Sequence, residues 1–214
     1  LFRSMEEDKA LEPVIAWHNE PDRGYTAVQI CTWDRAGLFA KIAGSLTAAG
    51  LNILSGQVFT RNDGVVLDTF YVTDAKTGAL PKKEEKDQFE KILTKVLTGE
   101  IDLRALIARQ KPVKPLYKSV EGETIPTMIS FDNHTAEKRT IIDLETEDRV
   151  GLLYVISQAF IDLGLDLALA KIVTEKGAAI DSFYVRYALG WKIETPEQQA
   201  EVEARLREAI ASLG

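Results

Sequence analysis

The chain has 214 residues, of which 45% are hydrophobic and 28% charged, as is typical of a globular protein with a buried core. No apolar run approaches the ~18 residues that a membrane helix needs, and the net charge of −7 argues against a nucleic-acid surface, which needs a basic stripe. The single cysteine, Cys31, cannot form an internal disulfide, so we expect a reducing, cytoplasmic location. The sequence starts at Leu1 rather than Met, and we interpret it as a piece of a longer protein.

The first part of the chain predicts a linker and two strands. Residues 1–11 are polar and charged, as expected of a linker or the tail of a preceding domain. Residues 14–17 and 25–32 predict strands, separated by a segment rich in turn-forming residues. The alternation in the second strand predicts a buried and a polar face, with Val28 and Ile30 set against Gln29 and Cys31.

A helix and a hairpin are predicted next. Asp34 is a good helix N-cap, because its carboxylate can accept hydrogen bonds from the first free amides of a helix. The apolar stripe that follows ends at Gly50, where a left-handed residue is favoured. Strands are then predicted at about 52–60 and 65–73, joined by a tight turn at 61–64 whose Asp-Gly pair favours a hairpin.

The first half of the chain closes with helices and a linker. Apolar spacing predicts a helix from about Lys83 to Gly99, and residues 101–110 predict a further helical segment. Two prolines within four residues cannot continue that helix, so we expect a linker over residues 111–125.

The second half repeats the first, which indicates a duplicated module. The helix predicted at its end is clearly marked, with Thr195 as N-cap, Pro196 in the first turn and Gln198 completing a capping box. Most matching segments are offset by 114 residues, and the last by 113: 34–39 with 148–153, 50–53 with 164–167, and 68–72 with 181–185.

We therefore predict an α+β fold of two ferredoxin-like modules, at 12–110 and 126–214. Each is expected to have an antiparallel four-stranded sheet with two helices on one face. The modules are predicted to be permuted, so that the strand before the first core strand fills the last-strand position. In the alternative, the strand at 127–131 belongs to the first module as its ordinary last strand. A short hairpin closes with less entropy than a long proline-bearing linker, which favours the local pairing.

The usual catalytic constellations are absent from the sequence. A nucleotidyltransferase needs Gly-Ser followed by paired aspartates that hold Mg²⁺, and the single Gly-Ser, Gly44-Ser45, lies in a predicted helix without them. The two histidines, His18 and His134, are too few for a histidine-rich metal site, and Cys31 has no nearby histidine to activate it. We therefore expect no catalytic residues and no metal site in this piece, which is not expected to be an enzyme.

Two modules that each carry Asp-Arg-x-Gly-Leu between the first core strand and the helix resemble ACT domains, small amino-acid-binding regulatory modules. The tandem more closely resembles the C-terminal region of bacterial bifunctional uridylyltransferase/uridylyl-removing enzymes, and the likeness covers nearly the whole chain from Pro13. The segments that carry it are 67–72, 129–133, 139–142, 148–154 and 181–185.

This resemblance implies a regulatory region that senses glutamine and holds no cofactor itself. It implies that upstream catalytic domains, absent from this piece, use Mg²⁺ and UTP to modify the PII nitrogen-signalling protein. In ACT domains, effectors commonly lie where two modules meet, between the first loop of one module and the start of a second strand nearby.

A helix start offers amides and a positive dipole to the carboxylate of an amino acid, and a glycine there lets a ligand approach the backbone. Asn52 offers both donors and an acceptor. The predicted effector-binding residues are Asp34, Arg35, Gly37, Leu38, Asn52 and Ile53, with Asp148, Arg149, Gly151, Leu152, Asp166 and Leu167 in the second copy.

Structural roles compete with these ligand-binding roles. Asp34 and Asp148 would cap helices in any case, the glycines of the motif could serve only helix packing, and Asn52 could be a turn residue. Asp68 and Asp181 share a strand face with apolar residues, so hydrogen bonds to nearby backbone are expected there rather than ligand contacts.

The two copies differ at one position of the predicted site. Asp166 stands where the first copy has Asn52, and a carboxylate cannot donate to a ligand carboxylate. We therefore expect unequal sites, with the Asn52 site nearer the usual ACT pattern. Two other functions stay open: a free-standing ACT-repeat protein that senses another amino acid, and a purely structural module that binds no small molecule. The structural module would pair through its open sheet edges with a partner, or with a second copy as a homodimer.

Overall fold

The computed structural model describes residues 12–59, 64–108, 125–175 and 177–213. The expected linker at 1–11, residues 111–124 of the expected linker at 111–125, and the turn residues 61–63 lie outside the described residues. The first half contains β1 (Val14–Glu20), a 3-10 turn (Pro21–Arg23), β2 (Tyr25–Trp33), α2 (Leu38–Ala48), β3 (Leu51–Phe59), β4 (Val65–Asp74), α3 (Lys83–Leu97) and α4 (Leu103–Ala108). The second half contains β5 (Met128–Asp132), β6 (Thr140–Glu147), α5 (Leu152–Asp162), β7 (Leu165–Glu175), β8 (Ala178–Tyr187) and α6 (Pro196–Ala211).

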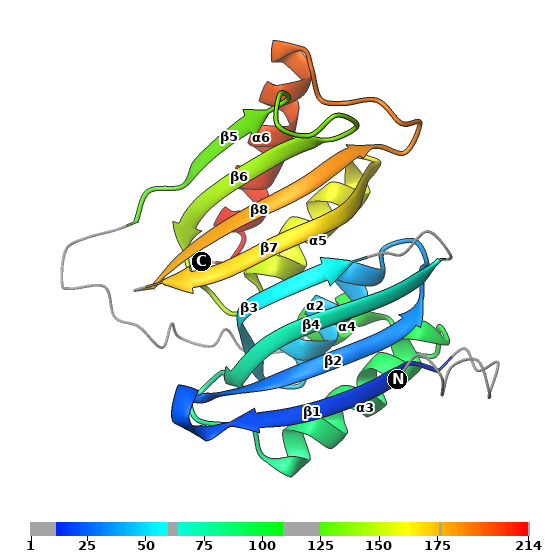
Figure 1. Ribbon diagram of the computed structural model, residues 1–214, viewed down its shortest axis with the longest axis vertical. Helices are drawn as coiled ribbons and strands as arrows, with labels where there is room; N and C mark the ends of the chain where they lie inside the picture. Colours follow the sequence, from blue (N-terminus) through cyan, green and yellow to red (C-terminus); the bar gives the residue numbers. More distant parts are fainter. Residues whose placement is uncertain (1–11, 60–63, 109–124, 176, 214) are drawn as a thin grey trace.

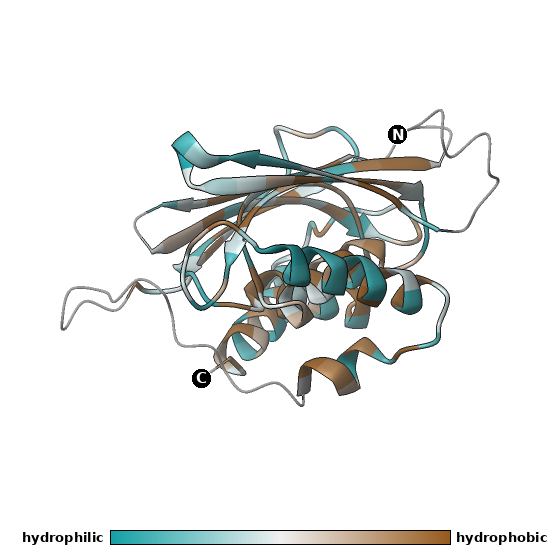
Figure 2. Ribbon diagram, turned by 90° about the horizontal axis from the view of Figure 1, so that it is seen from below, coloured by the Kyte–Doolittle hydropathy of each residue, from teal (hydrophilic) through white to brown (hydrophobic). Residues whose placement is uncertain are grey.

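The strands of the described residues form one antiparallel sheet of eight, in the order β1-β2-β4-β3-β7-β8-β6-β5 (Figure 1). The described helices lie on one face of this sheet, and none of them covers the other face (Figure 2). Each half contributes four consecutive strands with the order expected of a ferredoxin-like module. The predicted α+β fold class is therefore confirmed.

The strand-first permutation is also confirmed. In the first half β1 pairs with β2, with Trp17 opposite Val28, and in the second half β5 pairs with β6, with Phe131 opposite Ile142. Each opening strand thus occupies the position that the last strand takes in the unpermuted order. The module boundaries at 12–110 and 126–214 stay predictions.

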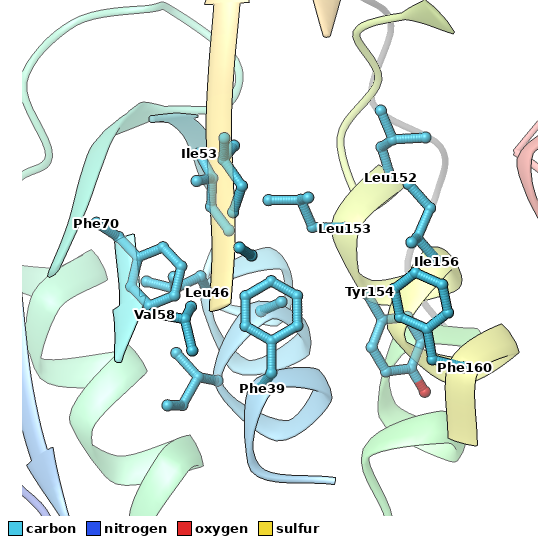
Figure 3. Packing of buried hydrophobic residues seen from close by; sticks show 14 of the residues in the cluster. Phe39, Leu46, Ile53, Val58, Phe70, Leu152, Leu153, Tyr154, Ile156 and Phe160 are labelled. Atoms are coloured by element: carbon cyan, nitrogen blue, oxygen red, sulfur yellow. The ribbon is translucent and has the colours of Figure 1, made fainter. Parts of the chain in front are cut away.

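The two halves join where β3 pairs with β7, from Ser55 opposite Val173 to Phe59 opposite Leu169. Beneath this seam, one hydrophobic core continues from the first half into the second. Figure 3 shows side chains of α2 and the neighbouring strands on one side and side chains of α5 on the other. Gly44 permits the close approach, because a Cβ there would lie 2.6 Å from a ring carbon of Tyr154.

Several local predictions agree with the elements, and the burial of Cys31 does not. Thr195 accepts a hydrogen bond from the Gln198 amide and completes the capping box of α6. The left-handed Gly50 and Gly164 follow α2 and α5 as expected. Cys31, which the alternation places on the polar face, is 1% exposed because Val65 and Val14 cover it there.

Candidate ligand site between the two halves

The loop before α2 has a different geometry from the one predicted. The Leu38 amide donates to the Arg35 carbonyl at 3.0 Å, and Gly37 is left-handed, with φ of 69°. This four-residue turn moves the helix start to Leu38, with Gly37 as N-cap. The predicted N-cap role of Asp34 is therefore wrong, because the extra turn places Asp34 too early in the chain to reach the first helical amides.

The second copy departs from the prediction in the same way. The Leu152 amide donates to the Arg149 carbonyl at 3.0 Å, and Gly151, with φ of 90°, is the N-cap of α5. Asp148 therefore does not cap α5. The motif glycine is required for its left-handed backbone at this turn, which the sequence interpretation did not include.

A cavity of about 200 Å³ lies between the loop before α2 and the elements α5 and β7 of the other half. We call it the first junction site. The predicted residues that line it come from both copies: Asp34, Arg35, Gly37, Leu38, Asp166 and Leu167. The other lining residues are Ala36, Phe39, Ala40, Val58, Val66, Asp68, Ser157, Phe160, Ile161 and Leu165.

The polar lining of this cavity is mainly acidic. Asp34, Asp68 and Asp166 contribute three carboxyl groups, of which Asp68 belongs to a fully buried residue. Arg35 contributes a cation that is tethered by contacts to the Leu97 carbonyl at 3.3 Å and the Thr32 hydroxyl at 3.4 Å. Phe39 and Ala40, in the first turn of α2, also line this cavity. The site can therefore offer acceptors to an ammonium group, and a cation and helix amides to a carboxylate.

Asp166 is held by two arginines at the edge of this cavity. Its carboxylate accepts hydrogen bonds from both terminal nitrogens of Arg139 at 3.2 Å, and its backbone carbonyl accepts another at 3.1 Å. Nε of Arg186 lies 3.6 Å from the same carboxylate oxygen. Sequence reasoning did not identify these arginines, since both contacts depend on strand pairing.

The equivalent surface on the other side of the seam is the second junction site, where the loop before α5 faces α2 and β3. Here Asn52 is 6% exposed, and its side-chain amide donates to the Asp148 carboxylate at 3.5 Å. A Cβ on Gly151 would lie 3.6 Å from Thr47 and 3.7 Å from Leu213. The groups of this site are therefore paired and packed against one another.

Burial changes the acidity of the carboxyl groups at the second junction site. Loss of solvation raises the pKa of Asp148, and the hydrogen bond from Asn52 partly offsets this. Burial also raises the pKa of Asp181 from its ordinary value of 3.8 to about 7, with the Asp148 charge adding to the effect. Oδ1 of Asp181 accepts the Val173 amide at 3.3 Å, the predicted kind of backbone contact, whereas Oδ2 has no hydrogen-bond partner among the described residues.

The predicted effector residues thus fall into two cross-half groups. Asp34, Arg35, Gly37 and Leu38 meet Asp166 and Leu167, whereas Asp148, Arg149, Gly151 and Leu152 lie in and beside the loop that faces Asn52 and Ile53 on β3. Asn52 is a buried strand residue and not a turn residue. The cavity described above is lined by Asp166, whereas Asn52 pairs with Asp148, so the two positions differ in their contacts. That the two sites bind ligand unequally stays a prediction.

Two features of the described residues bear on other functions. None of the described helices is both long enough and apolar enough to cross a bilayer. Among the same residues, no group of three or more His, Cys, Asp or Glu side chains is arranged to hold a metal ion.

Comparison with known proteins gives consistent matches. Residues 128–213 match the family model described as "ACR9-like, ACT-like domain". The bifunctional uridylyltransferase/uridylyl-removing enzyme of Rhodospirillum rubrum is 34% identical over 203 residues, which cover 95% of this chain and 22% of that protein. The enzyme of the same name from Azospirillum brasilense is 34% identical over 190 residues, covering 88% of this chain and 20% of that protein. Among solved structures, an aspartate kinase from Synechocystis aligns with 89% of this chain and 27% of its own at 14% identity, with a TM-score of 0.47, too low to support an argument.

The sheet, the helices on one face and the family match define an ACT-like regulatory module as the class of this protein. More particularly, nearly the whole chain is similar to one region of bifunctional uridylyltransferase/uridylyl-removing enzymes, and its second half matches the ACT-like family model. It spans about a fifth of the length of these relatives.

Proposed function

We propose that this region senses an amino acid, with glutamine as the ligand, and reports its level to catalytic domains of a longer cytoplasmic protein. The observation that carries the proposal is the first junction site, which combines acidic groups, an arginine and a helix start in one small cavity. Its volume of about 200 Å³ is below the ~300–1,000 Å³ of sites for drug-sized ligands, which suits a metabolite as small as an amino acid.

The charges of the site support a neutral side chain on the ligand. An α-ammonium group can pair with Asp34, and the α-carboxylate can approach Arg35 and the start of α2. A second carboxylate, as in glutamate, would face the three acidic groups of the cavity. Two like charges about 4 Å apart repel by roughly 4 kcal/mol at an effective dielectric constant of 20. Glutamine should therefore bind more tightly than glutamate.

The position of the site suggests how binding is transmitted. Its walls come from both halves, so a bound ligand stabilises one relative placement of the halves over others, as any such signal requires. We propose that the receivers are catalytic domains that use Mg²⁺ and UTP to modify the PII protein. Homodimers would form through the outer sheet edges, β1 and β5, each of which pairs with only one other strand among the described residues.

Calorimetric titration of the 214-residue chain with glutamine, glutamate and serine tests this proposal. We expect saturable binding of glutamine, at least tenfold weaker binding of glutamate, and at least tenfold weaker glutamine binding in Asp34→Asn. Asp148→Asn is the matched control, because it makes the same change at the second junction site and should alter the affinity by less than threefold. Tight binding of another amino acid would favour a free-standing repeat that senses that compound, and binding of none would favour a structural module.

A further inference from the structure

Asn52 and Asp166 occupy equivalent positions in the two halves but make opposite kinds of contact. Asn52 is buried and donates its amide to Asp148 in the loop of the other half. The side chain of Asp166 is 48% exposed and accepts hydrogen bonds from Arg139 of its own half. The same position therefore contributes to pairing across one junction site and lies at the edge of the cavity in the other.

The arginines that hold Asp166 have no counterparts in the first half. Asp166 pairs with Arg186 across β7 and β8, whereas Asn52 pairs with Thr73 across β3 and β4. Thr140 and Thr26 are equivalent, because each donates its hydroxyl to an asparagine seven residues earlier. The residue before Thr140 is Arg139, and the residue before Thr26 is Tyr25, so the first half has a tyrosine where the second has Arg139. The second copy thus has Asp166 together with its partners Arg139 and Arg186, and the first copy has none of the three.

The chemistry of the two side chains explains the different contacts. A carboxamide can donate a hydrogen bond to a carboxylate, so Asn52 can satisfy Asp148. An ionised carboxylate has no hydrogen to donate and repels another carboxylate, so Asp166 cannot do the same for Asp34. Arg139 and Arg186 instead stabilise Asp166 at the cavity edge.

We propose that Asp166 is a specificity-determining residue that keeps the first junction site available to ligand, and that Asn52 is a built-in substitute for the ligand at the second. The contact from Asn52 to Asp148 then shows what a ligand must bring to Asp34, namely an N–H donor from an ammonium or carboxamide group. This inference rests on the proposed amino-acid site and names the chemical group that the site recognises.

The test replaces Asp166 in the 214-residue chain with the residue of the first copy. In Asp166→Asn, the new amide donates to Asp34 and competes with ligand, so the affinity for glutamine should fall at least tenfold without a fall in melting temperature. Asp166→Ala is the comparison variant, since it removes the same carboxylate but supplies no donor, and its loss of affinity should be at least threefold smaller than that of Asp166→Asn. An unchanged affinity in Asp166→Asn would overturn the proposal, and an equal loss in both variants would show that Asp166 contacts the ligand itself.

A second measurement needs no ligand. The side-chain amide protons of Asn52 should exchange slowly with solvent in nuclear magnetic resonance spectra, and Asp166→Asn should add a second slowly exchanging side-chain amide. Rapid exchange of that new amide would overturn the inference even if wild type binds glutamine. If wild type binds no amino acid, the proposed function fails, and this measurement still decides whether residue 166 can close the first junction site.

Discussion

The two junction sites arise from the same repeated loop and strand, yet they have different contents. At the first, three aspartates, an arginine and a helix start surround a cavity. At the second, an asparagine and an aspartate pair with each other, and Thr47 and Leu213 pack near the motif glycine. Duplication has preserved the backbone turn at both sites, with its left-handed glycine, while a few side chains determine what each site can do.

In the proposed function, the two junction sites have separate roles. The buried, paired groups of the second junction site hold the halves together, whereas the cavity of the first junction site responds to ligand. Measurements of stability at the second junction site and of packing along the seam therefore test whether the two sites differ in this way.

Asp181 provides the largest expected effect. Its pKa is raised in the folded protein from 3.8 to about 7. The folded state therefore binds more protons than the unfolded state between about pH 4 and pH 7, and stability must fall as pH rises through this window. A shift of this size corresponds to roughly 4 kcal/mol, at about 1.4 kcal/mol for each pKa unit.

Asp181→Asn keeps an acceptor for the Val173 amide but cannot ionise. We expect this variant to lose most of the pH dependence and to be more stable than wild type at pH 8 by a few kcal/mol, measured by urea denaturation across pH. The exposed Asp22→Asn is the control and should leave the profile unchanged. A wild-type profile that is flat between pH 4 and pH 7 would show that the second junction is hydrated rather than closed.

Gly44 provides the next largest effect, and it tests the packing along the seam. In Gly44→Ala the new methyl would lie 2.6 Å from both Leu103 and Tyr154, so α4 or α5 must shift. We expect a loss of about 1–3 kcal/mol by thermal or urea denaturation, although alanine is the better helix former. Gln158, 114 residues later, holds the matching position on α5, and Gln158→Ala should cost less than 1 kcal/mol because Gln158 makes an exposed hydrogen bond to Arg104. A stabilising Gly44→Ala would mean that the halves pack less closely than described.

Much of this architecture could be predicted because its signals are local. The capping box at Thr195 and the hydrophobic alternation around Val28 each involve residues a few positions apart. The duplication itself predicted two equivalent modules. The N-cap role of Asp34 failed because Asp-Arg-x-Gly forms a turn before the helix, and a good capping residue also suits that turn.

The seam and the site between the halves could not be predicted in the same way. The register of β3 on β7 depends on two edge strands that meet without a connecting turn, so no local sequence signal sets it. Arg139 and Asp166 are 27 residues apart, and they meet only because β6 and β7 both pair with β8, so no local signal predicts their contact. The pairing of β3 with β7 determines that the loop before α5 faces Asn52 and that the loop before α2 faces Asp166. The position of the cavity therefore could not be predicted without that pairing.

Alanine at either motif glycine, Gly37 or Gly151, should lower stability the least of these changes, and the two variants compare the two junction sites directly. Gly37 and Gly151 are both left-handed, so alanine at either position should cost about 1–2 kcal/mol from backbone strain alone. At Gly37 the added methyl would also lie 3.0 Å from the end of the Ile161 side chain, whereas at Gly151 the nearest atom is 3.6 Å away. We therefore expect Gly37→Ala to lower the melting temperature slightly more than Gly151→Ala. We also expect it to weaken glutamine binding, because the new methyl would displace Ile161, which lines the cavity.

Gly37→Asn is the control for backbone strain. Asparagine tolerates the left-handed region, so this variant should lose less stability to backbone strain than Gly37→Ala, but its Cβ would still crowd Ile161. If Gly151→Ala weakened glutamine binding as much as Gly37→Ala, ligand would have to enter the second junction site, and the distinction between the two sites would be lost.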